Sequence, residues 1–179
     1  SGGTVTQNVV ITVTGTSDAP TVSASEDFVV SEEDLTNGNS GALIFTGDVG
    51  LNFNDYSSAG LSAKLKTSGA IPLDPSGALF DLSSDGVPMG YSLLTRADGT
   101  QKLTGFNFRT GEIAFVLDLD IVADGSGGFK VVYSFELRGN LDHLGIGAGD
   151  SIPLDFTVTA KNSAGETAEN TFTVTINDD

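Results

Sequence analysis

Apolar and polar residues alternate with a period of two along much of this chain, and this alternation restricts the fold more than any other feature. Residues 113–121 carry an apolar side chain at every second position, and the same period recurs in residues 131–137, 154–158 and 172–176. A strand with this period buries one face and exposes the other, as strands of antiparallel sheets do. The alternation therefore predicts an all-β chain built of antiparallel sheets.

Glycine-rich turns separate these strands at short intervals. Residues 124–128 read Asp-Gly-Ser-Gly-Gly and join two alternating segments, which is typical of a β-hairpin. Further Asp-Gly pairs stand at 85–86 and 98–99. No helical stripe is longer than about two turns, although a short helical turn fits residues 32–35 or 141–144. Short strands with frequent turns predict an antiparallel β-sandwich.

The two ends of the chain are similar to each other. Residues 11–18 (Ile-Thr-Val-Thr-Gly-Thr-Ser-Asp) match residues 172–179 (Phe-Thr-Val-Thr-Ile-Asn-Asp-Asp). Such an internal match is typical of a tandem array. We therefore interpret residues 1–18 as the last strand and the linker of a preceding repeat, and residues 19–179 as a single β-sandwich domain. The alternative is a chance similarity between strands that are rich in Thr and Val.

The charge of the chain excludes several kinds of partner. The sequence has 8 Lys+Arg against 24 Asp+Glu, which gives a formal net charge of −16. Such a charge repels phosphate backbones and anionic lipids, so we expect no nucleic-acid partner and no direct contact with a membrane. The chain has no cysteine, which excludes disulfides and thiolate metal sites.

Acidic residues cluster near the expected domain boundaries. Asp18 lies in the linker, Glu32, Glu33 and Asp34 follow soon after, and Asp178 stands near the end of the domain. Crowded carboxylates repel one another unless a cation neutralises them, and Ca²⁺ accepts about six to eight oxygen ligands. We therefore predict Ca²⁺ at these boundaries, the alternative being solvated surface charge. Weaker candidate ligands, in an irregular stretch and near a hairpin end, are Asp48, Asp55, Asp118 and Asp124.

The sequence carries no motif that indicates catalysis. The G-x-S-x-G elbow, the H-E-x-x-H helix and the P-loop are all absent. The single histidine, His143, follows Asp142, but sequence neighbours seldom orient each other in a triad, so a packing role is favoured. Many carboxylate pairs exist for glycoside hydrolysis, yet their spacing selects none. We therefore do not expect an enzyme.

Three segments give the chain a resemblance to a known family. They are residues 13–20 as an inter-domain linker, residues 139–143, and residues 152–159 leading to 172–179. In these segments the chain resembles an Ig-like or cadherin-like repeat of the giant RTX adhesins, which bacteria export by type I secretion. The resemblance implies an extracellular protein, attached to the cell through other parts, whose β-sandwich domains are stabilised by Ca²⁺. In the loop before the last strand, Asn162 and Glu166 could contribute further oxygen ligands.

The resemblance also implies a function in adhesion. The domain is longer than a plain sandwich of about 100 residues, and the extra length lies at residues 47–91, which we expect to form long irregular loops. Loops on a rigid scaffold often carry binding. We therefore expect a monomeric module that holds a short peptide or protein terminus on a host or neighbouring cell, in cell adhesion and biofilm formation. The predicted ligand-binding residues are Asn52, Asn54, Tyr56, Asp85 and Tyr91.

Two other functions stay open at this point. The domain could be a purely structural spacer, stiffened by Ca²⁺, whose partners are the neighbouring repeats of the same chain. A weaker alternative is a glycan-binding module or a hydrolase.

Overall fold

A computed structural model describes residues 2–11, 18–36, 43–143 and 150–178 of the chain. Almost all of its regular structure is β-strand, with one short helix, α1 (Glu33–Thr36). The strands are β1 (Thr21–Val22), β2 (Phe28–Ser31), β3 (Ile44–Phe53), β4 (Ser62–Leu65), β5 (Thr67–Ser68), β6 (Ile71–Pro72), β7 (Ser83–Ser84), β8 (Val87–Thr95), β9 (Gln101–Asn107), β10 (Ile113–Ala123), β11 (Phe129–Leu137), β12 (Ser151–Lys161) and β13 (Thr167–Asn177).

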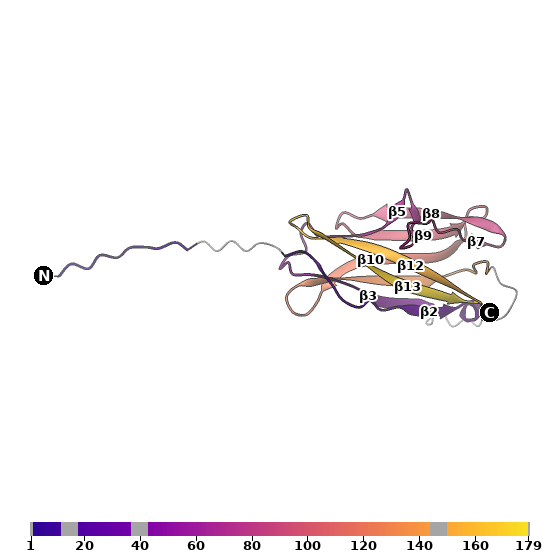
Figure 1. Cartoon of the computed structure of the whole chain (residues 1–179), viewed down its shortest axis with the longest axis horizontal. Coiled ribbons are helices and arrows are strands. Elements are labelled where there is room, and N and C mark those ends of the chain that lie inside the picture. The colour runs from indigo at the N-terminus through magenta and orange to yellow at the C-terminus, as the bar shows by residue number, and fades with distance from the viewer. Residues whose placement is uncertain (1, 12–17, 37–42, 144–149, 179) are drawn as a thin grey trace.

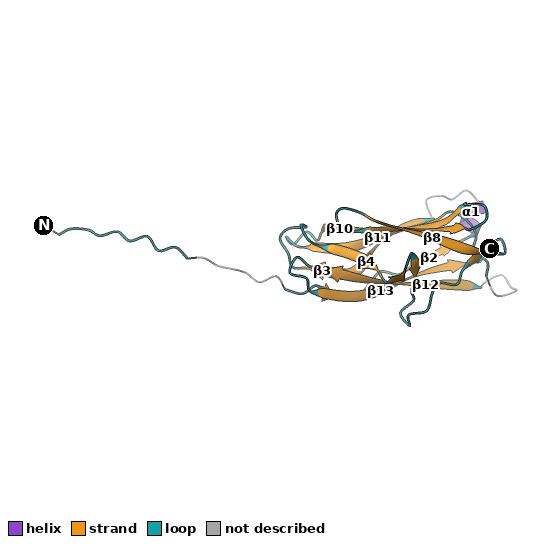
Figure 2. Cartoon of the chain, turned by 90° about the horizontal axis from the view of Figure 1, so that it is seen from above, coloured by secondary structure: helices purple, strands orange, loops and turns teal. Residues whose placement is uncertain are grey.

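Two curled sheets form the body of the molecule. The larger has seven strands in the order β1-β3-β11-β10-β9-β8-β7, and the smaller has four in the order β2-β13-β12-β4. Every pairing in these sheets is antiparallel except that of β2 with β13, which is parallel. Figures 1 and 2 show the sheets as layers of one elongated body. The predicted all-β, antiparallel sandwich is confirmed.

The period of two correctly located the strands that build the core. The predicted hairpin turn at 124–128 joins β10 to β11, and the last two alternating segments pair as β12 and β13 over their whole length. A register shift between Ile113 and Phe115 breaks the predicted face of β10, so Ile113 is 37% exposed while Ala114 is buried. A bulge follows the local needs of packing, which a strict alternation does not contain.

The expectation of irregular structure over residues 47–91 was wrong in part. Residues 44–53 form β3, a regular strand that pairs with β11, and residues 87–95 form β8. Gly50 has φ of 74° at a register shift in β3, and a Cβ there would lie 2.5 Å from the carbonyl oxygen of Ser23. The polar and glycine-rich segment that was expected to be a loop is therefore a bulged strand, β3. The short helical turn at 32–35 is confirmed by α1, while residues 141–143 carry no helix.

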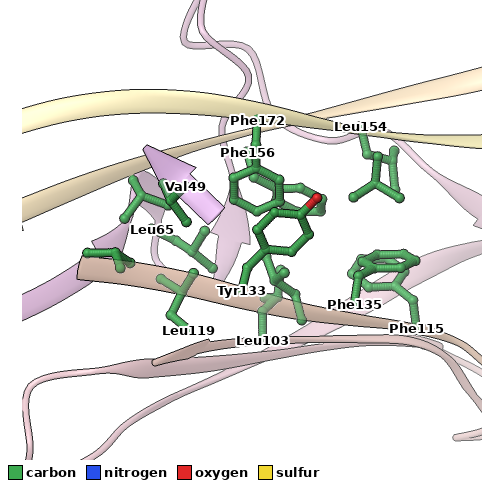
Figure 3. Close-up of a cluster of buried hydrophobic side chains, with 14 of the residues drawn as sticks. Val49, Leu65, Leu103, Phe115, Leu119, Tyr133, Phe135, Leu154, Phe156 and Phe172 are labelled. Carbon is green, nitrogen blue, oxygen red and sulfur yellow. The ribbon is translucent and has the colours of Figure 1, made fainter. Parts of the chain in front are cut away.

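Aromatic side chains from both sheets fill the space between them (Figure 3). Tyr133 on β11 stacks on Phe172 of β13, and Phe115 on β10 meets Phe156 of β12 edge to face. All four side chains are at most 1% exposed. Burial of each large side chain stabilises the fold by about 1.5–3 kcal/mol, so this cluster holds the sheets together.

The chain enters and leaves the body at opposite ends (Figure 1). Strands β12 and β13 run the length of the sandwich, which for eleven residues is roughly 35 Å. We call the end that holds Asp18 and the β12–β13 turn the proximal end, and the end that holds Asp178 the distal end. Residues 2–11 form no strand, and Val5, Val9 and Val10 are exposed. The interpretation of residues 1–18 as the last strand and the linker of a preceding repeat stays a prediction, and its residues 1 and 12–17 lie outside the described part of the chain. No helix in the described part of the chain is long and apolar enough to cross a membrane.

Candidate functional site

The parallel pairing of β2 with β13 brings two acidic residues together at the distal end. Ser31 and Asn177 are the last paired residues of the two strands, and the backbone N–H of Glu32 donates to the carbonyl of Asn177 at 3.0 Å. Because parallel strands end at the same edge, the next residues, Glu32 and Asp178, lie side by side. The N–H of Asp178 donates to the carbonyl of Asp150 at 2.9 Å, which fixes the end of β13.

A third residue reaches this place from the segment after β11. The N–H of Leu141 donates to Oε1 of Glu32 at 2.7 Å. The next residue, Asp142, is held twice, because its N–H donates to the carbonyl of Ser83 at 2.8 Å and its Oδ2 accepts from the N–H of Gly86 at 2.8 Å. These bonds position the backbone of His143, which follows directly.

Glu32, His143 and Asp178 form what we call the distal cluster. One potential ligand atom from each of the three lies within 4.8 Å of the other two. Nε2 of His143 is 3.6 Å from Oε1 of Glu32, and their side chains are only 3% and 2% exposed. Neither ring nitrogen of His143 has a hydrogen-bond partner among the described residues. This combination of a buried imidazole with carboxylates is a donor set for a metal ion.

Sequence reasoning selected Glu32 and Asp178 but not His143. The histidine is 111 positions from Glu32 along the chain, and only the fold brings them together. The one signal in the sequence is that His143 is the single histidine of the chain and follows an acidic residue. The predicted ligands Glu33 and Asp34 lie in the first turn of α1, directly after the distal cluster.

A second polar cluster, the proximal cluster, lies at the other end and consists of Asp18, Asp55, Asn162 and Glu166. Asn162 is 1% exposed, and its amide donates to the carbonyl of Asp18 at 3.0 Å and to Oε2 of Glu166 at 2.9 Å. Its Oδ1 accepts from the N–H of Glu166 at 2.7 Å. Asp55 is 9% exposed and accepts from the hydroxyl of Ser163 at 2.7 Å. The β12–β13 turn thus joins the incoming chain to oxygen-bearing side chains predicted as calcium ligands.

Two other predicted calcium ligands face cations of the protein itself. Both carboxylate oxygens of Asp118 accept from Nη2 of Arg96, which raises the pKa of Arg96 chiefly through this hydrogen bond. Oδ2 of Asp48 accepts from Nζ of Lys130 at 2.8 Å, and this bond likewise raises the pKa of Lys130. These carboxylates therefore have a balancing charge without an ion.

The predicted ligand Asp124 has a structural role in the hairpin between β10 and β11. Its Oδ1 accepts from the N–H of Ser126 at 2.7 Å and from the N–H of Gly128 at 3.0 Å. An aspartate that accepts two turn amides in this way holds the turn closed.

The predicted ligand-binding residues do not share one surface. Asn52 pairs with Thr21 near the proximal end, where Asn54 and Tyr56 follow, both exposed. Asp85 lies in the distal β7–β8 turn, whose Gly86 bonds to Asp142. Tyr91 is half-buried on β8, donates to the carbonyl of Phe80 at 3.3 Å, and has a raised pKa because of burial and the charge of Asp81.

Several cavities adjoin residues 81–91, and two of them share part of their wall. One of about 330 Å³ lies at the distal end, and its wall includes Leu82, Asp142, His143 and Ile152. Another of about 330 Å³ lies between Leu79, Leu82 and Tyr91. Both share Asp81 and Leu82, so residues 81–91, which include the predicted ligand-binding residues Asp85 and Tyr91, border concave, partly apolar surface.

No protein-family model matches this chain, and neither the curated proteins nor the solved structures gave a match. We therefore infer a function from the geometry of the two ends of the molecule.

Proposed function

We propose that this chain is a Ca²⁺-stabilised module of an extracellular, linear adhesin, and that it holds the neighbouring modules of its parent protein in line at the cell surface. One observation carries this proposal. The chain enters an elongated sandwich at one end and leaves it at the other (Figure 1). Clusters of oxygen-bearing side chains stand at both of these ends. Modules of this kind can be joined end to end without turning the chain back.

The proximal cluster is where Ca²⁺ would stiffen such a joint. Glu166 supplies a carboxylate that accepts from the amide of Asn162, and Asp55 supplies one that accepts from the neighbouring Ser163. The carbonyl of Asp18 accepts from the same asparagine. Carboxylate, amide and backbone carbonyl oxygens are the ligands that Ca²⁺ takes in proteins. An ion held here would fix the direction in which the linker meets the body. The net charge of −16 also makes binding of a dication favourable.

The calcium claim is tested by thermal melting of the 179-residue chain in Ca²⁺ and in EDTA. At a free Ca²⁺ concentration of about 100 Kd, each site adds about 2.7 kcal/mol, so the melting temperature rises by several degrees. Glu166→Gln and Asp55→Asn reduce this rise, whereas the matched control Glu112→Gln, at the distal end, keeps it. A melt that EDTA leaves unchanged contradicts the proposal.

The claim of a stiffened joint needs a separate measurement. The chain has no cysteine, so spin labels can be placed at chosen positions without background. Labels at Val5→Cys and Lys64→Cys report the distance between the linker side and the body. We expect Ca²⁺ to narrow the distribution of distances between these two labels. For a pair within the body, Lys64→Cys with Glu112→Cys, the width of the distribution should not change. Equal widths with and without Ca²⁺ would leave the module without its proposed mechanical role.

A second candidate function is capture of a short peptide or protein terminus, and the two adjoining cavities favour it. Leu79 is 51% exposed on the wall of one cavity, while Leu94, at 57%, is equally apolar but lines neither. Peptide and glycan libraries, screened with and without chelator, would identify a ligand. Leu79→Glu then abolishes capture and Leu94→Glu does not. If neither library yields a hit that Leu79→Glu removes, the spacer role is the better account.

A further inference from the structure

We propose that the distal cluster of Glu32, His143 and Asp178 binds Zn²⁺ or a similar borderline divalent transition metal. The site goes beyond the calcium-dependent role proposed above. It rests on three observations that the calcium argument does not use, namely a buried imidazole, the spacing of its nitrogen from a carboxylate, and the fixed backbone that carries both.

The first observation is the environment of the imidazole. The side chain of His143 is 3% exposed, yet neither of its nitrogens has a hydrogen bond among the described residues. A buried polar group without such a bond costs free energy, and most buried polar atoms in native proteins have a partner. Nε2 is directed at Glu32, so a cation between the two groups would satisfy it.

The second observation is the distance between the donor atoms. The 3.6 Å from Nε2 of His143 to Oε1 of Glu32 is too long for a good hydrogen bond. Zinc binds His nitrogen and carboxylate oxygen at about 2.0–2.2 Å, which puts two tetrahedral ligands about 3.4 Å apart. The measured separation is therefore close to that of two ligands of one ion. Asp178 adds a third donor within 4.8 Å of both.

The third observation is that the surrounding backbone already orients the donors. The N–H of Leu141 bonds to Oε1 of Glu32, and both hydrogen bonds of Asp142 hold the residue next to His143. A group that hydrogen-bonds a metal ligand, as the N–H of Leu141 does to Glu32, fixes the orientation of that ligand and raises metal affinity. His143 also lines the distal cavity of about 330 Å³, which gives an ion a path from solvent.

The donor set separates this site from a calcium site. Ca²⁺ takes oxygen ligands, six to eight of them, whereas an imidazole nitrogen suits Zn²⁺ and other transition metals. Two carboxylates and a neutral imidazole carry a charge that balances a dication. With three protein ligands, a fourth position stays for water or an outside donor.

The single histidine makes the test specific, because imidazole ¹⁵N signals in an NMR spectrum of the chain come from His143 alone. We expect one equivalent of Zn²⁺, added to the Ca²⁺-loaded chain, to shift one ring nitrogen to a metal-bound position. Excess Ca²⁺ does not produce this shift. Co²⁺ in place of zinc should give the visible absorption of a four-coordinate ion. Ring signals that stay unchanged at one equivalent of Zn²⁺ overturn the proposal.

Variants assign the ligands. Glu32→Gln keeps the shape and the acceptor for the Leu141 amide, and we expect it to weaken Zn²⁺ binding by more than about tenfold. His143→Asn should abolish binding. Glu112→Gln, at an exposed position of the distal end outside the distal cluster, serves as the matched control with unchanged Zn²⁺ affinity. If His143→Asn binds Zn²⁺ as tightly as the unmodified chain, the ion sits elsewhere and the proposal is wrong. The calcium melts are read independently, so either claim can fail without the other.

Discussion

The ring of Tyr133 lies on the ring of Phe172 across the two sheets, with centroids 3.8 Å apart and planes 13° from parallel. The hydroxyl of Tyr133 passes the edge of the core and donates to the carbonyl of Glu26 at 2.6 Å. One side chain thus joins β11, the facing strand β13 and the segment before β2. The pair therefore helps to hold the two sheets and the incoming chain together.

We expect Phe172→Ala to destabilise the fold by about 3–5 kcal/mol, because it leaves a cavity beside a ring that is fully buried. Tyr133→Phe keeps the stack and removes one hydrogen bond, so it should cost only about 1 kcal/mol. Phe108→Ala is the control, since Phe108 is 75% exposed and should change stability by less than about 0.5 kcal/mol. Urea unfolding measures all three. Equal effects of Phe172→Ala and Phe108→Ala would contradict this account of the core.

The free energy of unfolding should fall in alkali because of two phenols, Tyr133, which is buried, and Tyr91, which is half-buried. Burial raises the pKa of Tyr91 and of Tyr133 well above the ordinary value of 10.0, and neighbouring carboxylates add to the shift. Above pH 10 the unfolded chain loses these protons while the folded chain keeps them. The two phenols therefore contribute their full stabilisation below pH 10, and it is lost as the pH rises above that value.

Urea unfolding between about pH 9 and pH 11.5 checks this sign. The double variant Tyr91→Phe with Tyr133→Phe should show a shallower fall in the free energy of unfolding over that interval. Tyr56→Phe is the control, because the Tyr56 side chain is exposed. A fall of the same steepness in the double variant would assign the alkaline loss to other groups.

The ion pair of Arg96 with Asp118 allows a test of whether Asp118 has a structural role or binds Ca²⁺. Arg96 also donates to the carbonyl of Leu119 and to the hydroxyl of Thr100, each at 3.1 Å, so its guanidinium is held in place. Both partners of the pair are 30% exposed, and we expect Asp118→Asn to cost about 0.5–1 kcal/mol. The rise in melting temperature with Ca²⁺ should stay the same. If this variant lowers that rise and Asp120→Asn does not, Asp118 binds Ca²⁺ as the sequence predicted.

Asn162 links the incoming chain to the β12–β13 turn at the proximal end. Its amide makes three hydrogen bonds, to Asp18 and Glu166, while buried. We expect Asn162→Ala to cost about 2–3 kcal/mol, because it removes a buried amide together with its three hydrogen bonds. Asn54→Ala, at an exposed position, should have little effect. Thermal melts decide the comparison.

A charge variant at the same position links it to the proposed calcium site. Asn162→Asp keeps the acceptor for the Glu166 amide but adds a carboxylate next to Glu166. We expect this variant to be less stable than the unmodified chain in EDTA and to recover most of the loss in Ca²⁺. Loss without recovery would argue against an ion at the proximal cluster.

Most of the core could be predicted from the sequence, because the long strands that form hairpins follow one another directly in the chain and each shows the alternation with a period of two. Residues 113–137 contain both alternating strands and the turn between them, so pairing follows from neighbours in the chain. The bulge in β3 could not be predicted in this way. It depends on the close approach of Gly50 to the carbonyl of Ser23, which follows β1, and the polar composition of the bulge resembles that of a loop.

The distal cluster was predicted only in its parts. Crowding of acids at the boundary indicated Glu32 and Asp178, but β2 is a four-residue segment whose parallel partner lies at the far end of the chain. Periodicity carries no information on which strand pairs with which over such a separation. His143 reaches the cluster through hydrogen bonds of Leu141 and Asp142 that form only in the folded protein. A ligand set assembled from three distant segments is a property of the topology.

Asp85 was predicted as a ligand-binding residue, and the structure gives it a role in a turn that can be tested separately. Its φ is 54° and that of Gly86 is 68°, in the two-residue connection between the paired Ser84 and Val87. Positive φ at both positions defines a type I′ turn, which Asn and Gly adopt readily and β-branched residues do not.

We therefore expect Asp85→Asn to leave the free energy of unfolding within about 0.5 kcal/mol of the unmodified chain, because Asn adopts this conformation and only the charge is removed. Asp85→Val should cost about 1–2 kcal/mol, since its branched side chain opposes the left-handed backbone. Urea unfolding gives both values. If Asp85→Val is as stable as Asp85→Asn, the turn does not depend on this residue. If Asp85→Asn keeps its stability but loses binding to a peptide found by library screening, the carboxylate acts on the ligand and the turn only presents it.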